Sequence, residues 1–318
     1  MMMRRRRWPW VLGIALGLPV CLIGAFLAWT VWSGRTADSP LADVEVKELP
    51  AAWQSASEDV ETTQTPSSTL STAAPADAAP APADSGLLTE SLEGVLAFVG
   101  RGRPFGGERY AIEPLPEGGA RLASSGAFEF KVVLATIRVP FTQELTLDAA
   151  LNPQVYRLHI DGVVGFGERD VEMVVEGDLA RIRSGDAARE TPLGPDRPFV
   201  IGTFATYALV PLLLAGEPAE AEVTFDLFAF GGPPGGDDDD ASEARPAMTF
   251  GPLERRELRV GQDTFQVDAR PVRSELGDSL LLFTGEELLG VVAWGDGGEA
   301  GLLIYRADYF PDGFELLP

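Results

Sequence analysis

The chain has 318 residues, enough for one large or two small domains, and its 45% hydrophobic content is ample for a folded core. Its formal net charge of −23 argues against a nucleic-acid partner, because neutralising phosphates requires a basic surface. Cys21 is the only cysteine, which excludes an intrachain disulfide and any cysteine-based metal or catalytic site in the folded part.

The N-terminus is predicted to anchor the chain in a membrane. Residues 1–7 include four consecutive arginines, and residues 8–33 form an apolar run without a charge. About 25 helical residues span roughly 37 Å, more than a hydrocarbon core of about 30 Å. Basic residues stay on the cytoplasmic side. We therefore predict a single-pass protein of the cell membrane, with a cytoplasmic N-terminus and a periplasmic or extracellular C-terminal domain.

Three other targeting signals fit the N-terminal residues less well than this anchor. A cleaved signal peptide has an apolar region of about 7–15 residues, which is shorter than this run. Residues 18–21 resemble a lipoprotein signal, but Val20 stands where a small residue is expected and Cys21 lies in mid-span. A twin-arginine signal is not required, because four arginines satisfy the ordinary charge rule equally well. An uncleaved anchor is the favoured interpretation.

A linker is predicted over residues 34–85, which are rich in Ala, Pro, Ser, Thr and acidic residues. Such a composition buries too little apolar surface to offset the entropy lost on ordering, so we expect disorder. Residues 44–49 and Trp53 are interpreted as a short solvated segment rather than a docked one.

The folded part, residues 86–318, is predicted to be mainly β. Apolar side chains alternate with polar ones in several runs, which is typical of half-buried strands. The apolar positions change from even to odd numbers between Phe130 and Phe141, and this change predicts a bulge or bend near residues 135–136. Further strands are expected at residues 156–160, 171–175, 223–229, 258–260, 264–267, 279–283, 288–294 and 301–306.

Two other segments have competing interpretations. Residues 199–215 are uncharged, but polar and proline residues interrupt them and no basic flank follows, so we predict a buried strand and a short helix near residues 204–214 rather than a second crossing. Residues 235–240 end in four aspartates without the spacing of a calcium loop, and a solvated acidic loop is favoured. Residues 296–298, Asp-Gly-Gly, predict a tight turn.

Candidate chemistry is sparse. His159 is the only histidine, and it lies on the polar side of its predicted strand. Any histidine-dependent catalytic triad would therefore need His159 itself, and metal sites built on several histidines are excluded. Paired carboxylates remain open, because 48 acidic residues make such pairs common. We predict no enzyme, no catalytic residue, no metal and no cofactor; a metal-independent carboxylate hydrolase is the one enzymatic alternative.

Three segments resemble bacterial envelope proteins of unknown function whose domain is a curved sheet like that of the LolA-type lipoprotein carriers. They are Gly-Glu-Arg-Tyr-Ala-Ile at residues 107–112, the turn and strand at residues 148–156, and the strand and Gly-Asp turn at residues 171–180. The resemblance covers roughly residues 105–306. It implies an antiparallel half-barrel or barrel wrapped on a helix, with an apolar concave face that holds acyl chains or a partner. The long linker and the anchor depart from the soluble carriers.

The first functional hypothesis is a membrane-anchored domain that binds a lipid or another apolar ligand. Large apolar side chains in the predicted sheet would face that ligand; they are Phe128, Phe130, Phe141, Tyr156 and Met173. The alternative is a structural or protein-interaction module of the envelope. Alternation does not separate the two, because a filled core and an empty cavity show the same pattern.

Overall fold

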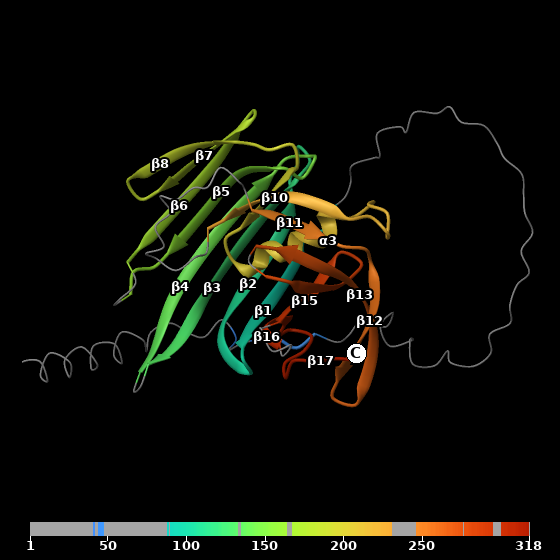
Figure 1. The fold of residues 1–318 in the computed structure, drawn as a ribbon. Helices are drawn as coiled ribbons and strands as arrows, with labels where there is room; N and C mark the ends of the chain where they lie inside the picture. Colours follow the sequence, from blue (N-terminus) through green and yellow to red (C-terminus); the bar gives the residue numbers. More distant parts are fainter. Residues whose placement is uncertain are drawn as a thin grey trace, which may run out of the picture.

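The computed structural model describes residues 41, 44–47, 88, 90–132, 135–163, 167–230, 246–275, 277–294 and 300–317. Within these residues the chain forms one curved, mainly antiparallel sheet of 17 strands and one short helical segment (Figure 1). The predicted cytoplasmic end, the membrane anchor, most of the linker, the aspartate run and the 296–298 turn lie outside the described residues. No helix among those described is both long and apolar enough to cross a membrane.

The first half of the fold is a meander, in which each strand pairs antiparallel with the next in sequence. Figure 1 shows it as one broad, twisted sheet. Its strands are β1 (Leu92–Gly100), β2 (Arg103–Pro114), β3 (Ala120–Val132), β4 (Ala135–Leu147), β5 (Pro153–Ile160), β6 (Arg169–Glu176), β7 (Leu179–Ser184) and β8 (Ala187–Pro192).

Tight turns hold this meander together, and glycine occupies the positions that need positive φ. Arg101 and Gly102 have φ of 47° and 72°, the two positive values that a type I′ hairpin requires. Gly118 and Gly119, both at 85°, turn the chain from β2 into β3. The turn between β1 and β2 has only two residues, Arg101 and Gly102, and β2 follows it directly.

The second half returns along the opposite edge of β1. Its elements are β9 (Arg197–Ile201), η2 (Phe204–Leu209), α3 (Val210–Leu213), β10 (Val223–Ala229), β11 (Ala247–Phe250), β12 (Glu254–Val260), β13 (Asp263–Ser274), β14 (Ser279–Thr284), β15 (Glu287–Trp294), β16 (Ala300–Arg306) and β17 (Glu315–Leu316). β16 pairs antiparallel with β1, from Leu96 opposite Arg306 to Gly100 opposite Leu302. β9 pairs parallel with β10. No ladder among the described residues joins β8 to β9, so the sheet is curved but open rather than a closed barrel.

The helical segment fills the inner face of this curve. The prediction of a buried strand and short helix over residues 199–215 is confirmed by β9, η2 and α3. Pro211 lies in the first turn of α3, where its missing N–H costs nothing. Almost every side chain from Ala205 to Leu213 is buried, as expected for a helix that is apolar all round.

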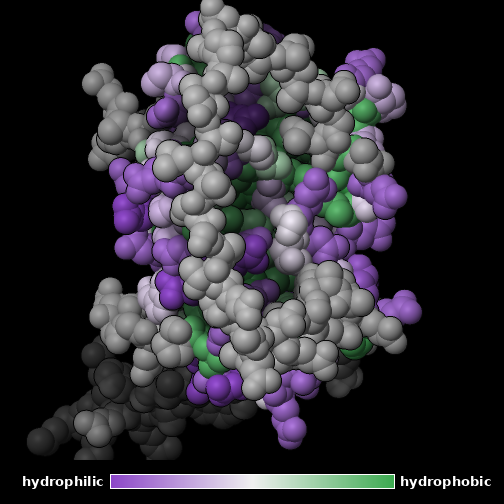
Figure 2. Space-filling model, turned by 90° about the vertical axis from the view of Figure 1, so that its right-hand side faces the viewer, coloured by the Kyte–Doolittle hydropathy of each residue, from purple (hydrophilic) through white to green (hydrophobic). Residues whose placement is uncertain are grey.

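The two faces of the sheet carry separate cores. The inner core packs against η2 and α3 and draws on nearly all strands, with Leu96, Phe98 and Ile112 at 0% exposure. The outer core lies on β1 and β12–β16, under residues 307–310 of the C-terminal segment. Farther along the same outer face, β4–β7 present charged side chains to solvent. Figure 2 shows hydrophobic side chains in a recessed strip bordered by hydrophilic ones.

Of the bulge or bend predicted near residues 135–136, the structure shows a change of direction and no bulge, because the chain reverses between β3 and β4. Val132 pairs with Ala135 across the β3–β4 hairpin, and Phe130 pairs with Ile137. Paired residues of adjacent antiparallel strands lie on the same face. Each of these pairs joins an even-numbered residue to an odd-numbered one. The inward positions therefore switch parity without any bulge.

The segment at residues 44–47 is docked rather than purely solvated. Val44 and Leu41 are partly buried against the outer core, and the Lys47 N–H donates to the Asp308 carbonyl at 2.7 Å. The side chains of this segment still face water in part, since Val46 is 57% exposed.

Candidate functional site

The five side chains predicted to face an apolar ligand separate into two groups. Phe141, Tyr156 and Met173 are at most 2% exposed and belong to the inner core. Phe128 is half-buried, with its ring 4.8 Å from that of Phe141, and Phe130 is 40% exposed near the end of β3. None of these five lines any of the three grooves described below. The inner face around Phe141, Tyr156 and Met173 is thus packed by the chain itself.

A buried carboxyl, Glu108 on β2, lies in the middle of this inner face. Its Oε1 accepts hydrogen bonds from the hydroxyls of Ser124 and Thr203, each at 2.5 Å, and Oε2 accepts one from the Ala205 N–H at 2.9 Å. Gln143 Nε2 lies 3.3 Å from Oε1. Burial raises the Glu108 pKa from its ordinary 4.5 to about 7, although the donors around it act to lower that pKa. The interactions connect β2, β3 and β4 to the start of η2.

A second buried charged cluster lies at the β1–β16 seam. Arg306, 1% exposed, binds Asp308 through Nε at 2.8 Å and Nη2 at 2.7 Å. Its Nη1 donates to the Tyr110 hydroxyl at 3.1 Å, and Nη2 also donates to the Glu93 carbonyl. Burial alone would raise the Asp308 pKa, but the hydrogen bonds and charge of Arg306 outweigh it and leave that pKa lowered. Lys47 Nζ lies 3.3 Å from Asp308 Oδ2.

The outward side of β3–β7 is an open charged groove of about 830 Å³. We call it the charged groove. Glu172 is its central residue, with Oε1 3.0 Å from Arg157 Nε and Oε2 3.0 Å from Arg183 Nη2. Glu144 on β4 pairs with Arg121 at 2.9 Å. Opposite charges on directly opposed strand positions stabilise the sheet modestly, which is the ordinary role of such a row.

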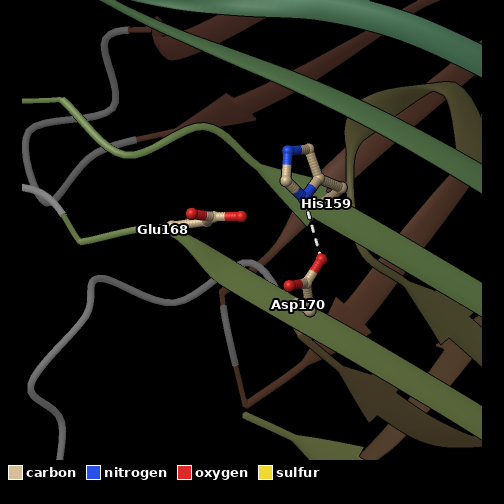
Figure 3. A group of neighbouring side chains, drawn as sticks. All are labelled: His159, Glu168 and Asp170. Atoms are coloured by element: carbon tan, nitrogen blue, oxygen red, sulfur yellow. Dashed lines mark hydrogen bonds and ion pairs between the residues drawn. The ribbon is translucent and has the colours of Figure 1, made fainter.

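At one end of the charged groove, the single histidine lies among carboxylates. His159 on β5 is directly opposite Asp170 on β6, with Nδ1 2.8 Å from Oδ1 (Figure 3). Its Nε2 lies 2.9 Å from Asp161 Oδ1. Hydrogen bonds to Asp170 and Asp161 raise the pKa of the His159 imidazole. One ligand atom each from His159, Glu168 and Asp170 lie within 4.8 Å of one another.

Sequence reasoning identified His159 but not its neighbours. The pattern His-x-Asp at 159–161 and Glu-x-Asp at 168–170, at the adjacent ends of β5 and β6, was the available signal. Reading it requires the β5–β6 register, since a shift by one residue moves one pair to the other face. Glu108 and Arg306 had no such signal, because each lies in a run that reads as ordinary strand.

Comparison with known proteins adds little. No protein-family model matches the chain, and no curated protein matches it. A β-barrel-like protein of the domain of unknown function DUF1849 from Brucella abortus aligns over 72% of this chain and 97% of its own, with 8% identity and a TM-score of 0.41. A DUF1089 family protein from Pseudomonas aeruginosa aligns over the same shares, with 12% identity and a TM-score of 0.36. Both belong to families of unknown function, and neither similarity assigns an activity.

Proposed function

We propose that this chain is a membrane-tethered, extracytoplasmic interaction module of the cell envelope that acts through its surfaces. The observation that supports this most directly is the packed inner face. Residues 205–213 cover the curve that a LolA-like carrier would use for an acyl chain, and Phe141, Tyr156 and Met173 are buried beneath neighbouring side chains. An inner face covered by the chain's own side chains leaves the outer surfaces as the places for recognition.

The charged groove is the surface that we assign to a protein partner. It is open, it runs across five neighbouring strands, and its charges of both signs lie on a rigid ladder. Alternating charges give orientation and specificity to a complex more than raw affinity. A partner with its own ordered charges of both signs matches this surface better than a polyanion does.

In-cell photo-crosslinking tests the groove. A photoreactive p-benzoylphenylalanine replaces Thr142, an exposed groove residue on β4, or Thr264, an exposed threonine on β13 outside the groove. We expect a discrete protein adduct from position 142 and none of that size from position 264. The same adduct pattern from both positions, or no adduct from the groove, would argue against the interaction module.

The tether has its own test. Residues 1–33 support an anchor with the domain outside the cytoplasm, as argued from the arginines and the apolar run. We expect protease added to intact spheroplasts to digest the domain, and the chain to remain in the membrane fraction after carbonate extraction. Protection of the domain until the spheroplasts are lysed would contradict this orientation.

An apolar ligand remains a second candidate, at a different place from the predicted one. A groove of about 510 Å³ opens beside β13–β15 and β17, and Leu280, Trp294 and Leu316 help to line it. Among the described residues, Trp294 is one of three large apolar side chains exposed to solvent, and it is 43% exposed. We expect a photoreactive fatty acid to label peptides carrying Trp294 and Leu316, and Trp294→Ala to reduce that labelling. Label confined to residues 8–33 would leave only the anchor as a lipid contact.

A further inference from the structure

The β5–β6 hairpin carries four polar side chains in a square on one face of the sheet. His159 and Asp161 lie two residues apart on β5 and just beyond it, and Glu168 and Asp170 lie two residues apart across the turn. His159 is the register partner of Asp170. Alternate residues of a strand share a face, so all four side chains point outward together.

The strand frame brings these residues close at a defined spacing. A Cβ at Gly162 would lie 2.9 Å from the Glu168 backbone nitrogen, so the two strand ends approach each other too closely for most side chains there. Gly162 therefore keeps Asp161 and Glu168 at the mouth of the hairpin. Figure 3 shows the Glu168 and Asp170 carboxylates on the same side as the His159 ring.

The nearby arginines leave this square acidic. Arg157 and Arg183 both bind Glu172, on the far side of Asp170 from the turn. Arg169 lies between Glu168 and Asp170 in sequence but alternates to the inner face, where its charge acts on Tyr156. The His159 imidazole thus hydrogen-bonds with two carboxylates, those of Asp161 and Asp170, and a third, that of Glu168, has an oxygen within 4.8 Å of ligand atoms of His159 and Asp170.

We propose that His159, Glu168 and Asp170 bind a divalent cation of the zinc class, with Asp161 as the residue that orients the imidazole. Imidazole nitrogen and carboxylate oxygen are ligands that Zn²⁺ takes at about 2.0–2.2 Å in tetrahedral geometry, which separates the ligand atoms by roughly 3.3 Å. Nδ1 of His159 is the nitrogen that faces Asp170, at 2.8 Å from Oδ1. Nε2 faces Asp161 at 2.9 Å. A ligating histidine whose other nitrogen donates to a carboxylate is the usual second-shell arrangement.

The fourth coordination position would face the charged groove. His159 and Asp170 both line that groove, and their side chains are 39% and 69% exposed. A cation there has three protein ligands and an open side, the arrangement that leaves room for water or for a ligand group from a partner. The exposure also means that the cation exchanges with the surroundings, so occupancy follows the extracytoplasmic cation supply.

The test uses the full chain without a histidine tag, in detergent micelles, dialysed against Zn²⁺ in the presence of excess Mg²⁺. The aspartates at residues 237–240 and the net charge of −23 make weak, unspecific binding a concern, so stoichiometry alone does not decide. Because His159 is the only histidine, nitrogen hyperfine coupling from an imidazole in the electron paramagnetic resonance spectrum of bound Cu²⁺ can come from this residue alone.

We expect one tightly bound Zn²⁺ per chain and an imidazole signal with Cu²⁺. Glu168→Gln and Asp170→Asn are each expected to weaken Zn²⁺ binding at least tenfold, and Asp161→Asn by about tenfold or more. His159→Gln should remove the imidazole signal. Glu172→Gln, a groove carboxylate outside the square, is the matched control and should bind Zn²⁺ as the unaltered chain does.

Two results would overturn the proposal. One is Zn²⁺ binding that His159→Gln, Glu168→Gln and Asp170→Asn leave unchanged. The other is an absence of imidazole coupling in the unaltered chain, which would mean that His159 only bridges Asp161 and Asp170. Circular dichroism of each variant checks that the sheet is intact, so that a loss of binding is not a loss of fold.

Discussion

Two buried ionisable sites are in contact with β2, one through Glu108 and the other through Tyr110, and they respond to burial in opposite ways. Glu108 and Tyr110, two residues apart on β2, both point to the inner face. Glu108 is surrounded by hydroxyl, amide and backbone donors, and burial raises its pKa to about 7. Arg306 and Asp308, beside Tyr110, keep opposite charges through two hydrogen bonds. A buried carboxyl that is surrounded only by neutral donors has a raised pKa, whereas a buried carboxyl that is paired with a cation has a lowered pKa and stays ionised.

The largest expected effect comes from breaking the ion pair. Arg306→Met leaves Asp308 buried without its main partner, and such changes cost about 3–5 kcal/mol of unfolding free energy. Thermal unfolding by circular dichroism measures the loss. The matched control is Arg255→Met, because Arg255 pairs with Asp268 while its side chain is 68% exposed. Equal losses for the two variants would show that burial does not distinguish the two pairs.

The contribution of Glu108 to the free energy of unfolding should depend on pH with the opposite sign to that of Asp308. Its raised pKa means that the folded state holds the proton more tightly, so its stabilising contribution is full below pH 4.5 and is lost as the pH rises to about 7. Those two to three pKa units correspond to about 3 kcal/mol. Asp308, with its lowered pKa, stabilises at neutral pH and loses that contribution in acid.

Glu108→Gln isolates the first effect. We expect the variant to lose the decline in unfolding free energy between pH 4.5 and 7 that the unaltered chain shows, since glutamine does not titrate. Denaturation at several pH values measures both chains, and other titrating groups cancel in the difference. Parallel curves for the two chains would contradict a titrating Glu108.

Tyr110→Phe should cost about 2 kcal/mol, within the range for a hydrogen bond to a charged group. The change removes the hydroxyl that accepts from Arg306 Nη1 at 3.1 Å and leaves that buried donor unpaired. A double-mutant cycle with Arg306→Met sharpens the result. In the Arg306→Met background, Tyr110→Phe should cost little, and an unchanged cost would mean that the hydroxyl does not act through Arg306.

The smallest effect is expected from Lys47→Ala. Lys47 lies 3.3 Å from Asp308, but its side chain is 47% exposed, and exposed pairs contribute less than about 1 kcal/mol. Hydrogen exchange of the Lys47 amide, which donates to the Asp308 carbonyl, should be faster in the variant. Lys131→Ala, which alters the other lysine of the chain, is the control and should leave that exchange rate unchanged.

Much of the sheet could be predicted from alternation, because its strands are half-buried and the pattern of Tyr156, Leu158 and Ile160 reports one face. The polar strand β8 could not, since its side chains are almost all exposed and carry no such pattern. The bulge was a misreading of parity. A hairpin that pairs even with odd positions produces the same switch, and alternation alone does not tell them apart.

The candidate site was harder to predict than the fold. His159 was found by its uniqueness, but Glu168 and Asp170 come to it through the register of two strands, and register is a tertiary property. Nor did the sequence distinguish packed from ligand-facing aromatic residues. Phe141 and Phe130 look alike in the pattern, yet one is buried and the other is 40% exposed.

Synthesis proceeds from the N-terminus, so β1 is made long before its partner β16. β2 to β8 pair with near neighbours and can fold as they are synthesised, but one edge of β1 waits for β16, almost the last strand. Until then, Leu-Glu-Gly-Val-Leu-Ala-Phe-Val-Gly is an unpaired, apolar strand edge, the kind of segment that aggregates. Incomplete chains that end before β16 are therefore expected to aggregate rather than to persist as half-domains, because that edge of β1 stays unpaired until residues 300–306 have been made.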